Sequence, residues 1–217
     1  MLTDLQSETV YEERLNELRY AFNKVCALNH VDNDFICICK SNIVLMMYNL
    51  IESTVVNTMK EYYCHMFNNP DCAKKNKKTL DIWVDSIMNS SFGASRSFND
   101  YKETAHGLIT KYCNNEIKAD YHKNDSGNLD AKSIKKMCDT HKIALIKCQR
   151  FSDVDITNQL HNIKRIRNTL AHGEQSFIET GRDISENDLT NNIDLVAEYL
   201  QCFLKSIDAH IKRVILK

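Results

Sequence analysis

Residues that interrupt regular structure are scarce in this chain. Its 217 residues include only five glycines and one proline. Glycine and proline supply the tight turns of β-rich folds, and proline also interrupts helices. Their scarcity disfavours a turn-rich β architecture and leaves long helices without interruptions. A chain of this length buries a full-sized core, so we expect one domain over residues 1–217, with an N-terminal helix at 3–29 and a core at 35–217.

The chain also lacks a strong charge of either sign. Its 28 Lys and Arg residues nearly balance 29 Asp and Glu residues, for a net charge of −1. Contacts with nucleic acid therefore have to use local basic patches. No apolar run reaches the ~18–20 residues of a membrane span. Met1 is followed by a polar stretch instead of the apolar segment of a signal peptide. We expect a cytoplasmic protein with no membrane contact.

Metal-binding spacings are missing as well. The nine cysteines include no Cys-x2-Cys pair. Scattered thiols of odd number, mostly among apolar residues, favour buried thiols over disulfides in a chain that is not secreted. The nearest approach to a ligand set is Cys37-x-Cys39, and Cys64-His65 with Cys72. Because this spacing does not match a zinc site, we expect no metal and no other cofactor.

Helical periodicity is abundant. Apolar residues recur every three or four positions in 3–29, 35–67, 80–87, 101–121, 129–141, 153–172 and from 189 to the C-terminus. The stretch 35–67 is apolar almost all round, which is typical of a central helix. Residues 143–146 are too few for periodicity to assign, and the chain from Gly173 to Ile184 is polar and irregular. We predict an all-α fold, a single antiparallel bundle of about five to seven helices.

One helix carries an unusual charged residue. Its apolar stripe consists of Ile156, Leu160, Ile163, Ile166 and Leu170. Arg167 falls inside this stripe, although a guanidinium cannot lose its charge and is rarely buried without a partner. Asp153 is the predicted N-cap, and Gly173 is a good stop signal that places His172 in the last turn.

The spacing of Arg167 and His172 leaves their arrangement open. Five residues correspond to about 140° around an ideal helix, so the two side chains would not share a face. They converge on one substrate if the helix ends between them, or if a second copy of the chain supplies the other half. In isolation, such a pair is more often a structural ion pair and a capping histidine.

The neighbouring residues extend the pattern. Arg-Asn-x-x-Ala-His-Gly at the end of an amphipathic helix resembles the HEPN superfamily (higher eukaryotes and prokaryotes nucleotide-binding), whose signature is an arginine followed a few residues later by a histidine. Further matching blocks are Tyr48-Asn49-Leu50-Ile51-Glu52-Ser53-Thr54, Gly127-Asn128-Leu129-Asp130, Ser176-Phe177-x-Glu179-x-Gly181-Arg182 and Asp188-Leu189. This ordered set looks like the prokaryotic MAE-type HEPN branch and spans residues 41–217. The resemblance implies a HEPN-like helical bundle.

The resemblance also implies a reaction, since HEPN proteins of this kind are often metal-independent endoribonucleases. His172 suits acid–base catalysis because the unperturbed pKa of histidine, about 6.5, allows it to accept and donate protons near neutral pH. The planar fork of Arg167 suits a phosphoryl group that gains charge. Asn168 would orient the phosphate or the histidine. Glu52 is either a carboxylate bonded to a neighbouring helix or the partner of Arg167 or His172.

Family members commonly dimerise with their motif helices facing each other. A homodimer would place two Arg167–His172 pairs in one groove, with a basic lining from Lys164, Arg165 and His161. Lys164 and Arg165 are equally typical of a solvated helix face. The alternative is a non-catalytic HEPN module that binds nucleotide or a partner protein in a larger defence complex.

The genetic setting of the family is often toxin–antitoxin or anti-phage defence, so the resemblance implies an antitoxin or an ATPase as a partner. Some HEPN toxins carry a tyrosine two residues after the motif histidine, which a partner nucleotidyltransferase modifies. This chain has Glu174 at that position. The resemblance therefore does not support neutralisation through that tyrosine.

Overall fold

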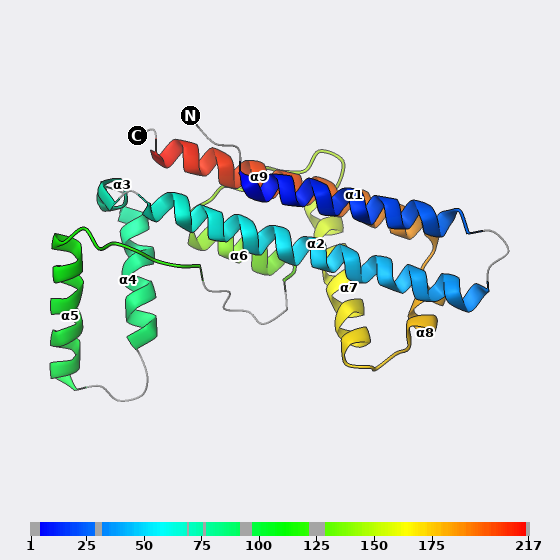
Figure 1. Cartoon of the computed structure of the whole chain (residues 1–217), viewed down its shortest axis with the longest axis horizontal. Helices are drawn as coiled ribbons and strands as arrows, with labels where there is room; N and C mark the ends of the chain where they lie inside the picture. The colour runs from blue at the N-terminus through cyan, green and yellow to red at the C-terminus, as the bar shows by residue number, and fades with distance from the viewer. Residues whose placement is uncertain are drawn as a thin grey trace. The chain divides into compact units, whose positions relative to one another are not determined.

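Helices are the only regular secondary structure in the described part of the chain. The computed structural model describes residues 5–28, 32–68, 70–75, 77–91, 97–121 and 129–215. These ranges contain nine α-helices and no strand (Figure 1): α1 (Gln6–Cys26), α2 (Asn33–Phe67), α3 (Pro70–Lys75), α4 (Lys77–Ser91), α5 (Phe98–Cys113), α6 (Ala131–Thr140), α7 (Asp153–Ala171), α8 (Phe177–Arg182) and α9 (Glu186–Ile215). The predicted all-α class is confirmed.

The count exceeds the predicted range because two helices are too short to predict from periodicity. α3 and α8 have six residues each, too few for a periodic apolar pattern to emerge. The interpretation of residues after Gly173 as irregular is therefore wrong over Phe177–Arg182. The side chain of Ser176 accepts a hydrogen bond from the amide of Glu179, and the Glu179 carboxylate accepts one from the Ser176 amide. This capping box starts α8.

One predicted helix end is also wrong. The helix expected over 101–121 ends at Cys113. Asn115 adopts the left-handed conformation, with φ of 61°. The amides of Asn115 and Glu116 then donate to the carbonyls of Tyr112 and Lys111, at 3.3 and 2.8 Å. These bonds form the Schellman arrangement that terminates helices, with asparagine in the place usually taken by glycine.

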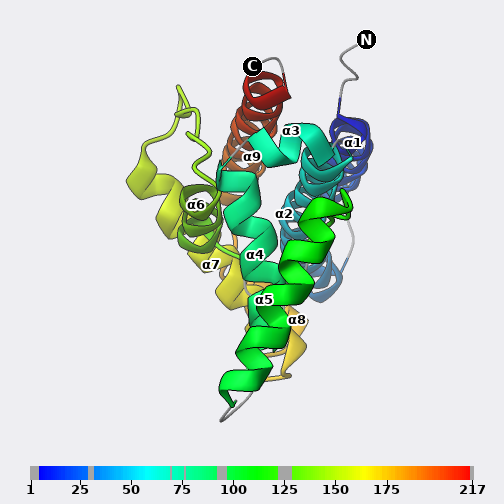
Figure 2. The ribbon, with the colours of Figure 1, turned by 90° about the vertical axis from the view of Figure 1, so that its left-hand side faces the viewer.

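Contacts between residues divide the chain into two compact units. The first unit comprises Met1–Thr58 and Lys123–Asp208, and the second comprises Met59–His122 and Ala209–Lys217. Within the first unit, α1 and the adjoining parts of α2 and α9 run side by side (Figures 1 and 2). The hydroxyl of Tyr11 in α1 donates to the carbonyl of Ala197 in α9 at 2.9 Å. The first unit also holds α6, α7 and α8, and so every predicted site residue.

The central helix α2 is long and apolar enough to cross a membrane. This finding corrects the expectation that no stretch reaches that length. Of the apolar window in α2, 44 % is buried within the fold. Side chains exposed by 2 % or less include Ile43, Met47, Tyr48, Ile51, Val55 and Met59. Such burial is also typical of the central helix of a helical bundle.

Several aromatic side chains of the second unit contact one another. The rings of Tyr63 and Tyr121 lie 5.6 Å apart, and those of Tyr62 and His210 lie 5.9 Å apart. The ammonium of Lys74 lies 4.5 Å from the centre of the Tyr112 ring. Lys74 is thus engaged in a cation–π contact.

The cysteines differ partly from expectation. Eight of them are free thiols in the described ranges, as expected, but only Cys37 and Cys138 are buried. Cys26, Cys64 and Cys113 are exposed. Burial raises the pKa of the Cys138 thiol to about 12, so this thiol behaves as an inert apolar side chain.

Gly181 forms the joint between α8 and α2. A Cβ atom at Gly181 would lie 2.0 Å from the carbonyl oxygen of Cys37. The same joint is closed by the Ser41 hydroxyl, which donates to the Phe177 carbonyl at 2.7 Å, and by an ion pair of 3.0 Å between Arg182 and Asp34. Only glycine allows the two helix backbones to approach this closely.

A second joint connects α6 to α7. The Asp130 carboxylate accepts the Ser133 amide at 2.9 Å, which caps α6. Its other oxygen pairs with the Lys164 ammonium of α7. Burial tends to raise the pKa of Asp130, but the hydrogen bonds from Lys164 and Ser133 outweigh burial and hold this pKa below its usual value. The ionised carboxylate therefore stabilises the joint.

Gly181→Ala should destabilise the protein by about 1–3 kcal/mol, because backbone atoms cannot yield to the added methyl group. Gly107→Ala is the matched control, since Gly107 is exposed on α5 and a Cβ atom there would have no heavy atom within 4 Å. That change should be neutral or stabilising by about 0.5–1 kcal/mol, because alanine favours helices. Urea denaturation followed by circular dichroism measures both. Equal losses from the two variants would contradict the contact as the cause.

Asp130→Asn should cost about 1–2 kcal/mol at pH 7, because asparagine retains the cap but leaves Lys164 without its ionic partner. A carboxylate with a lowered folded pKa stabilises above its unfolded pKa and loses that effect as the pH falls through the folded pKa. The stability gap between wild type and variant should therefore narrow below about pH 4. Urea titrations at several pH values test this, and Lys164→Met should cost less in the variant than in wild type. A gap independent of pH would rule out the charge as its source.

Candidate functional site

The motif helix α7 has well-defined ends. Its N-cap is Ser152, whose hydroxyl accepts the Asp155 amide while the Asp155 carboxylate accepts the Ser152 amide. The predicted cap, Asp153, is wrong by one position: it is the first helical residue. Serine followed three residues later by aspartate makes the reciprocal pair of a capping box, and this pair places the helix start at Ser152.

The other end of α7 lies between Arg167 and His172. Gly173 adopts a left-handed φ of 70°. The amides of Gly173 and Glu174 donate to the carbonyls of Leu170 and Thr169, at 3.2 and 3.0 Å, in a Schellman arrangement. Ala171 is the last helical residue, and His172 is the C-cap with an exposed side chain. The helix thus ends between Arg167 and His172. This is the first of the two arrangements that would let both side chains reach one substrate.

Arg167 is half-buried and has partners within its own chain. Its guanidinium carbon lies 5.0 Å from the centre of the Tyr48 ring, and its Nη1 donates to Asn168 Oδ1 at 3.0 Å. The sequence offers Glu52 as the candidate partner for this charge within one chain. The structure adds two partners to that candidate, because a cation–π contact and a side-chain amide both stabilise the guanidinium. Asn168 thus orients the arginine.

Tyr48 connects the predicted site residues. It is fully buried in α2, and its hydroxyl accepts the Leu129 amide at 3.2 Å. Burial raises the pKa of the Tyr48 hydroxyl, which the Leu129 hydrogen bond opposes; the charge of Glu52 raises that pKa further and the charge of Arg167 lowers it. Glu52, one turn along α2 and half-buried, therefore acts on the same group as Arg167. Periodicity did not single out Tyr48 as a site residue, because a tyrosine in an apolar helix resembles any core residue. Its place at the start of the family-like block at 48–54 was the signal that could have found it.

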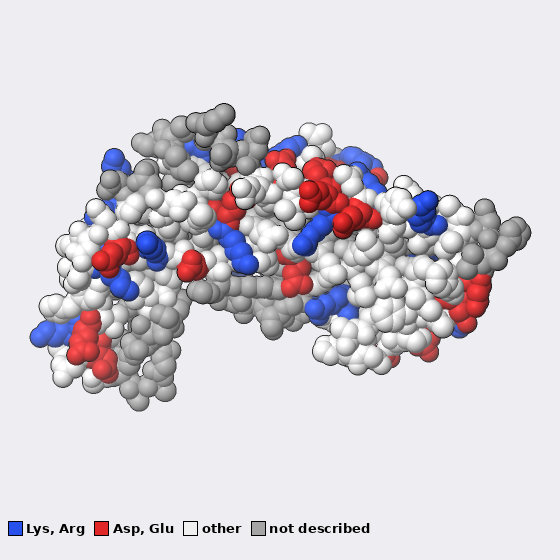
Figure 3. Space-filling model, viewed as in Figure 1, with Lys and Arg blue, Asp and Glu red and all other residues white. Residues whose placement is uncertain are grey.

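The three residues of the expected basic lining occupy different settings. Lys164 is paired with Asp130 in the α6–α7 joint. His161 and Arg165 are exposed. Arg165 lies two residues from Arg167, about 200° around the helix, so the two guanidinium groups face opposite sides of α7. On the face shown in Figure 3, the described Lys and Arg residues are interspersed with Asp and Glu and form no continuous basic patch.

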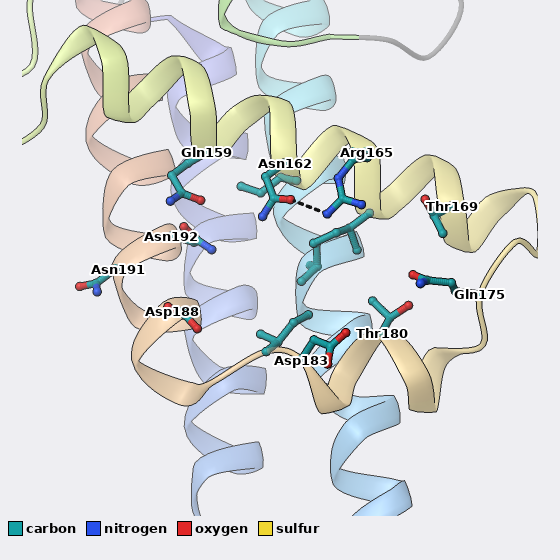
Figure 4. Close-up of a pocket in the computed structure, with 14 residues that line it drawn as sticks. Gln159, Asn162, Arg165, Thr169, Gln175, Thr180, Asp183, Asp188, Asn191 and Asn192 are labelled. Carbon is teal, nitrogen blue, oxygen red and sulfur yellow. Dashed lines mark hydrogen bonds between the residues drawn. The ribbon is translucent and has the colours of Figure 1, made fainter.

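Arg165 faces a polar pocket that the sequence did not reveal. The pocket has a volume of about 300 Å³ and lies between α7 on one side and α8 with the start of α9 on the other (Figure 4). Neither Arg167 nor His172 lines it. Its lining comprises Val44, Gln159, Asn162, Ile163, Arg165, Ile166, Thr169, Gln175, Thr180, Asp183, Ile184, Asp188, Asn191 and Asn192. No local motif predicts a pocket assembled from four segments.

Metal ligands do not gather in the described part of the chain. No group of three His, Cys, Asp or Glu side chains there could hold a metal ion. The side chain of Cys72, one of the weak candidates from the sequence, lies outside the described residues. The arrangement that remains is a fixed planar cation on the last full turn of α7 and an exposed imidazole at its end. Such groups can bind a phosphoryl oxygen and move a proton.

Comparison with known proteins supports the resemblance seen in the motif. A family model described as RiboL-PSP-HEPN matches residues 9–209. No curated protein and no solved structure matches the chain. The match covers nearly the whole chain and confirms the HEPN superfamily, whereas the MAE-type branch stays a prediction. The chain belongs to the RiboL-PSP-HEPN family of the HEPN superfamily.

Proposed function

We propose that the protein is a metal-independent endoribonuclease that cleaves RNA through attack of a 2′-hydroxyl on the adjacent phosphate. HEPN membership supports a nuclease or a nucleotide-binding module. The observation that favours the nuclease is the placement of Arg167: its guanidinium is oriented by the Tyr48 ring and the Asn168 amide close to the exposed His172 along the chain. A module that only binds protein partners needs neither group.

The reaction uses proton transfers that a histidine can perform. Neutral His172 accepts the proton of the 2′-hydroxyl, and the 2′-oxygen forms a bond to phosphorus. The bond from phosphorus to the 5′-oxygen breaks, and that oxygen takes a proton from an imidazolium. The products are a 2′,3′-cyclic phosphate and a 5′-hydroxyl. DNA lacks the attacking hydroxyl and would not be cut by this route.

Arg167 stabilises the negative charge that develops on the phosphoryl oxygens. Its contacts with Tyr48 and Asn168 hold the guanidinium before the substrate arrives, so little reorganisation is needed during the reaction. We keep Glu52 in this cluster because it lies one turn from Tyr48 on α2, where its charge raises the pKa of the Tyr48 hydroxyl. His161 and Arg165 remain our assignments for RNA contact. Lys164 could contact phosphate only by leaving Asp130.

We further propose a homodimer with the two α7 helices facing each other, which supplies a second histidine as the acid. Because Arg167 is stabilised within one chain, the proposal of a dimer rests on the catalytic need for two proton-transfer groups and on the exposure of His172.

We propose a role as a toxin or anti-phage effector in the cytoplasm, with an antitoxin or ATPase as regulator. HEPN membership supports this setting.

His172→Ala and Arg167→Ala should each reduce RNA cleavage by at least about 100-fold, since acid–base and electrostatic groups each contribute on that order. Arg167→Lys keeps the charge but loses the planar fork, and should also be impaired. His106→Ala, an exposed histidine on α5, is the matched control. The assay is cleavage of transfer RNA in EDTA with end-group analysis. Near-normal cleavage by a folded His172→Ala, or 3′-hydroxyl ends, would reject the mechanism and favour the non-catalytic module or metal-dependent hydrolysis.

If the groove is shared, mixing wild type with excess His172→Ala protein should lower activity more than dilution explains, because mixed dimers carry one defective half. Light scattering should give about twice the mass of one chain. Subunit exchange must be confirmed independently with differently tagged chains. Activity that falls only in proportion to dilution, despite exchange, would show that each subunit cleaves alone.

A further inference from the structure

The polar pocket beside α7 contains a buried hydroxyl that lacks a partner. Thr180 on α8 is only 6 % exposed, and its Oγ1 has no hydrogen-bond partner among the described residues. Figure 4 shows Thr180 rising from α8 toward α7 inside the pocket. A buried hydroxyl without a hydrogen bond carries a free-energy cost, so such groups usually have a partner. A ligand in the pocket would supply one.

The lining restricts the chemistry of that ligand. Side-chain amides dominate the wall: Gln159, Asn162, Gln175, Asn191 and Asn192. One guanidinium and two carboxylates, of Arg165, Asp183 and Asp188, leave the lining with a net charge of −1. An anion such as phosphate is therefore disfavoured inside. A ligand with several donors and acceptors and no negative charge fits these groups.

A nucleobase meets these requirements. The volume of about 300 Å³ lies at the small end of the usual range for ligand sites, roughly 300–1,000 Å³, and suits a single base. Side-chain amides pair with base edges through one donor and one acceptor, and carboxylates accept from exocyclic amino groups. Arg165 Nη2 donates to Asn162 Oδ1 at 3.0 Å, which fixes a planar cation on which a base can stack.

The pocket also lies near the proposed site along the chain. Gln175, part of its wall, follows His172 by three residues. Three residues span at most about 11 Å even when fully extended. A base close to a phosphate at His172 can therefore reach the pocket while that phosphate stays outside its negatively charged interior.

We propose that the pocket lined by Asn162, Arg165 and Thr180 binds one unstacked nucleobase of the RNA substrate, with a preference for bases that carry an amino group. This proposal rests on the proposed nuclease function only for the source of the base. The base-binding chemistry itself can be measured without cleavage, using free nucleosides.

The test is titration of wild-type protein with adenosine, cytidine, uridine and inorganic phosphate, followed by NMR and calorimetry. Adenosine or cytidine should bind saturably and about fivefold or more tightly than uridine, which has no exocyclic amino group. Phosphate should not occupy the pocket. Absence of saturable nucleoside binding at millimolar concentration, or binding of phosphate in place of nucleosides, would overturn the proposal.

Thr180→Val is the decisive variant. Valine keeps the shape of threonine and removes the hydroxyl, so the melting temperature should stay the same or rise, because an unsatisfied buried group disappears. Nucleoside affinity should nevertheless fall about tenfold. Thr157→Val on α7, outside the pocket, should leave affinity unchanged. Unchanged affinity in Thr180→Val would refute the assigned role of the hydroxyl.

Arg165→Ala provides a second variant that does not threaten folding, since this side chain is exposed. It too should weaken nucleoside binding. Nucleoside binding without cyclic-phosphate products would reject the nuclease and keep the pocket. Cleavage without nucleoside binding, together with an unchanged cutting pattern in Thr180→Val, would reject the base-binding pocket and keep the nuclease.

The source of the base is resolved with His172→Ala protein and short RNA that stays uncut. Tighter binding of RNA than of nucleoside, lost when one nucleotide is made abasic, identifies a base of the strand. Equal affinity for RNA and adenosine identifies a free nucleoside as the occupant, and would overturn the assignment to the RNA substrate.

Discussion

The cation–π contact of Arg167 with the buried ring of Tyr48 is the interaction on which the candidate site depends. Tyr48 belongs to the central helix α2, receives the Leu129 amide on its hydroxyl, and carries the guanidinium of α7 on its ring. One side chain thus positions the start of α6 and the end of α7 relative to the core of the first unit. It also explains how a permanent charge can lie in an apolar stripe, because the ring face attracts the cation without requiring a buried carboxylate.

Most of the sequence blocks that suggested the family resemblance are joints of the fold. Ser176 and Glu179 cap α8, Gly181 lets α8 contact the backbone of α2, and Asp130 caps α6 while pairing with Lys164. These residues are explained by stability. His172 is different: its side chain is exposed at a helix end that Gly173 already terminates. An exposed side chain at such a defined position is where function is best sought.

The two faces of α7 carry different groups. One face presents Arg167 toward Tyr48, and the opposite face presents Arg165 toward the amide-lined pocket with Thr180. Under the proposed function, this arrangement separates phosphate binding, which needs uncompensated positive charge, from recognition of a neutral base, which needs paired donors and acceptors. The small net charge of the chain agrees with local groups in place of a broad basic surface.

Sequence alone determined the features that depend on local order. Scarce glycine and proline and the apolar periodicity of the long segments predicted the all-α class, because helix formation and capping are decided within a few residues. The motif, which is also a local pattern, indicated the superfamily. The sequence alone did not predict the six-residue helices or the partners of Arg167. The ring of Tyr48 and the pocket around Thr180 bring together residues more than 100 positions apart. Only tertiary packing decides which distant side chains meet, since many sequences share the same periodicity and differ in those contacts.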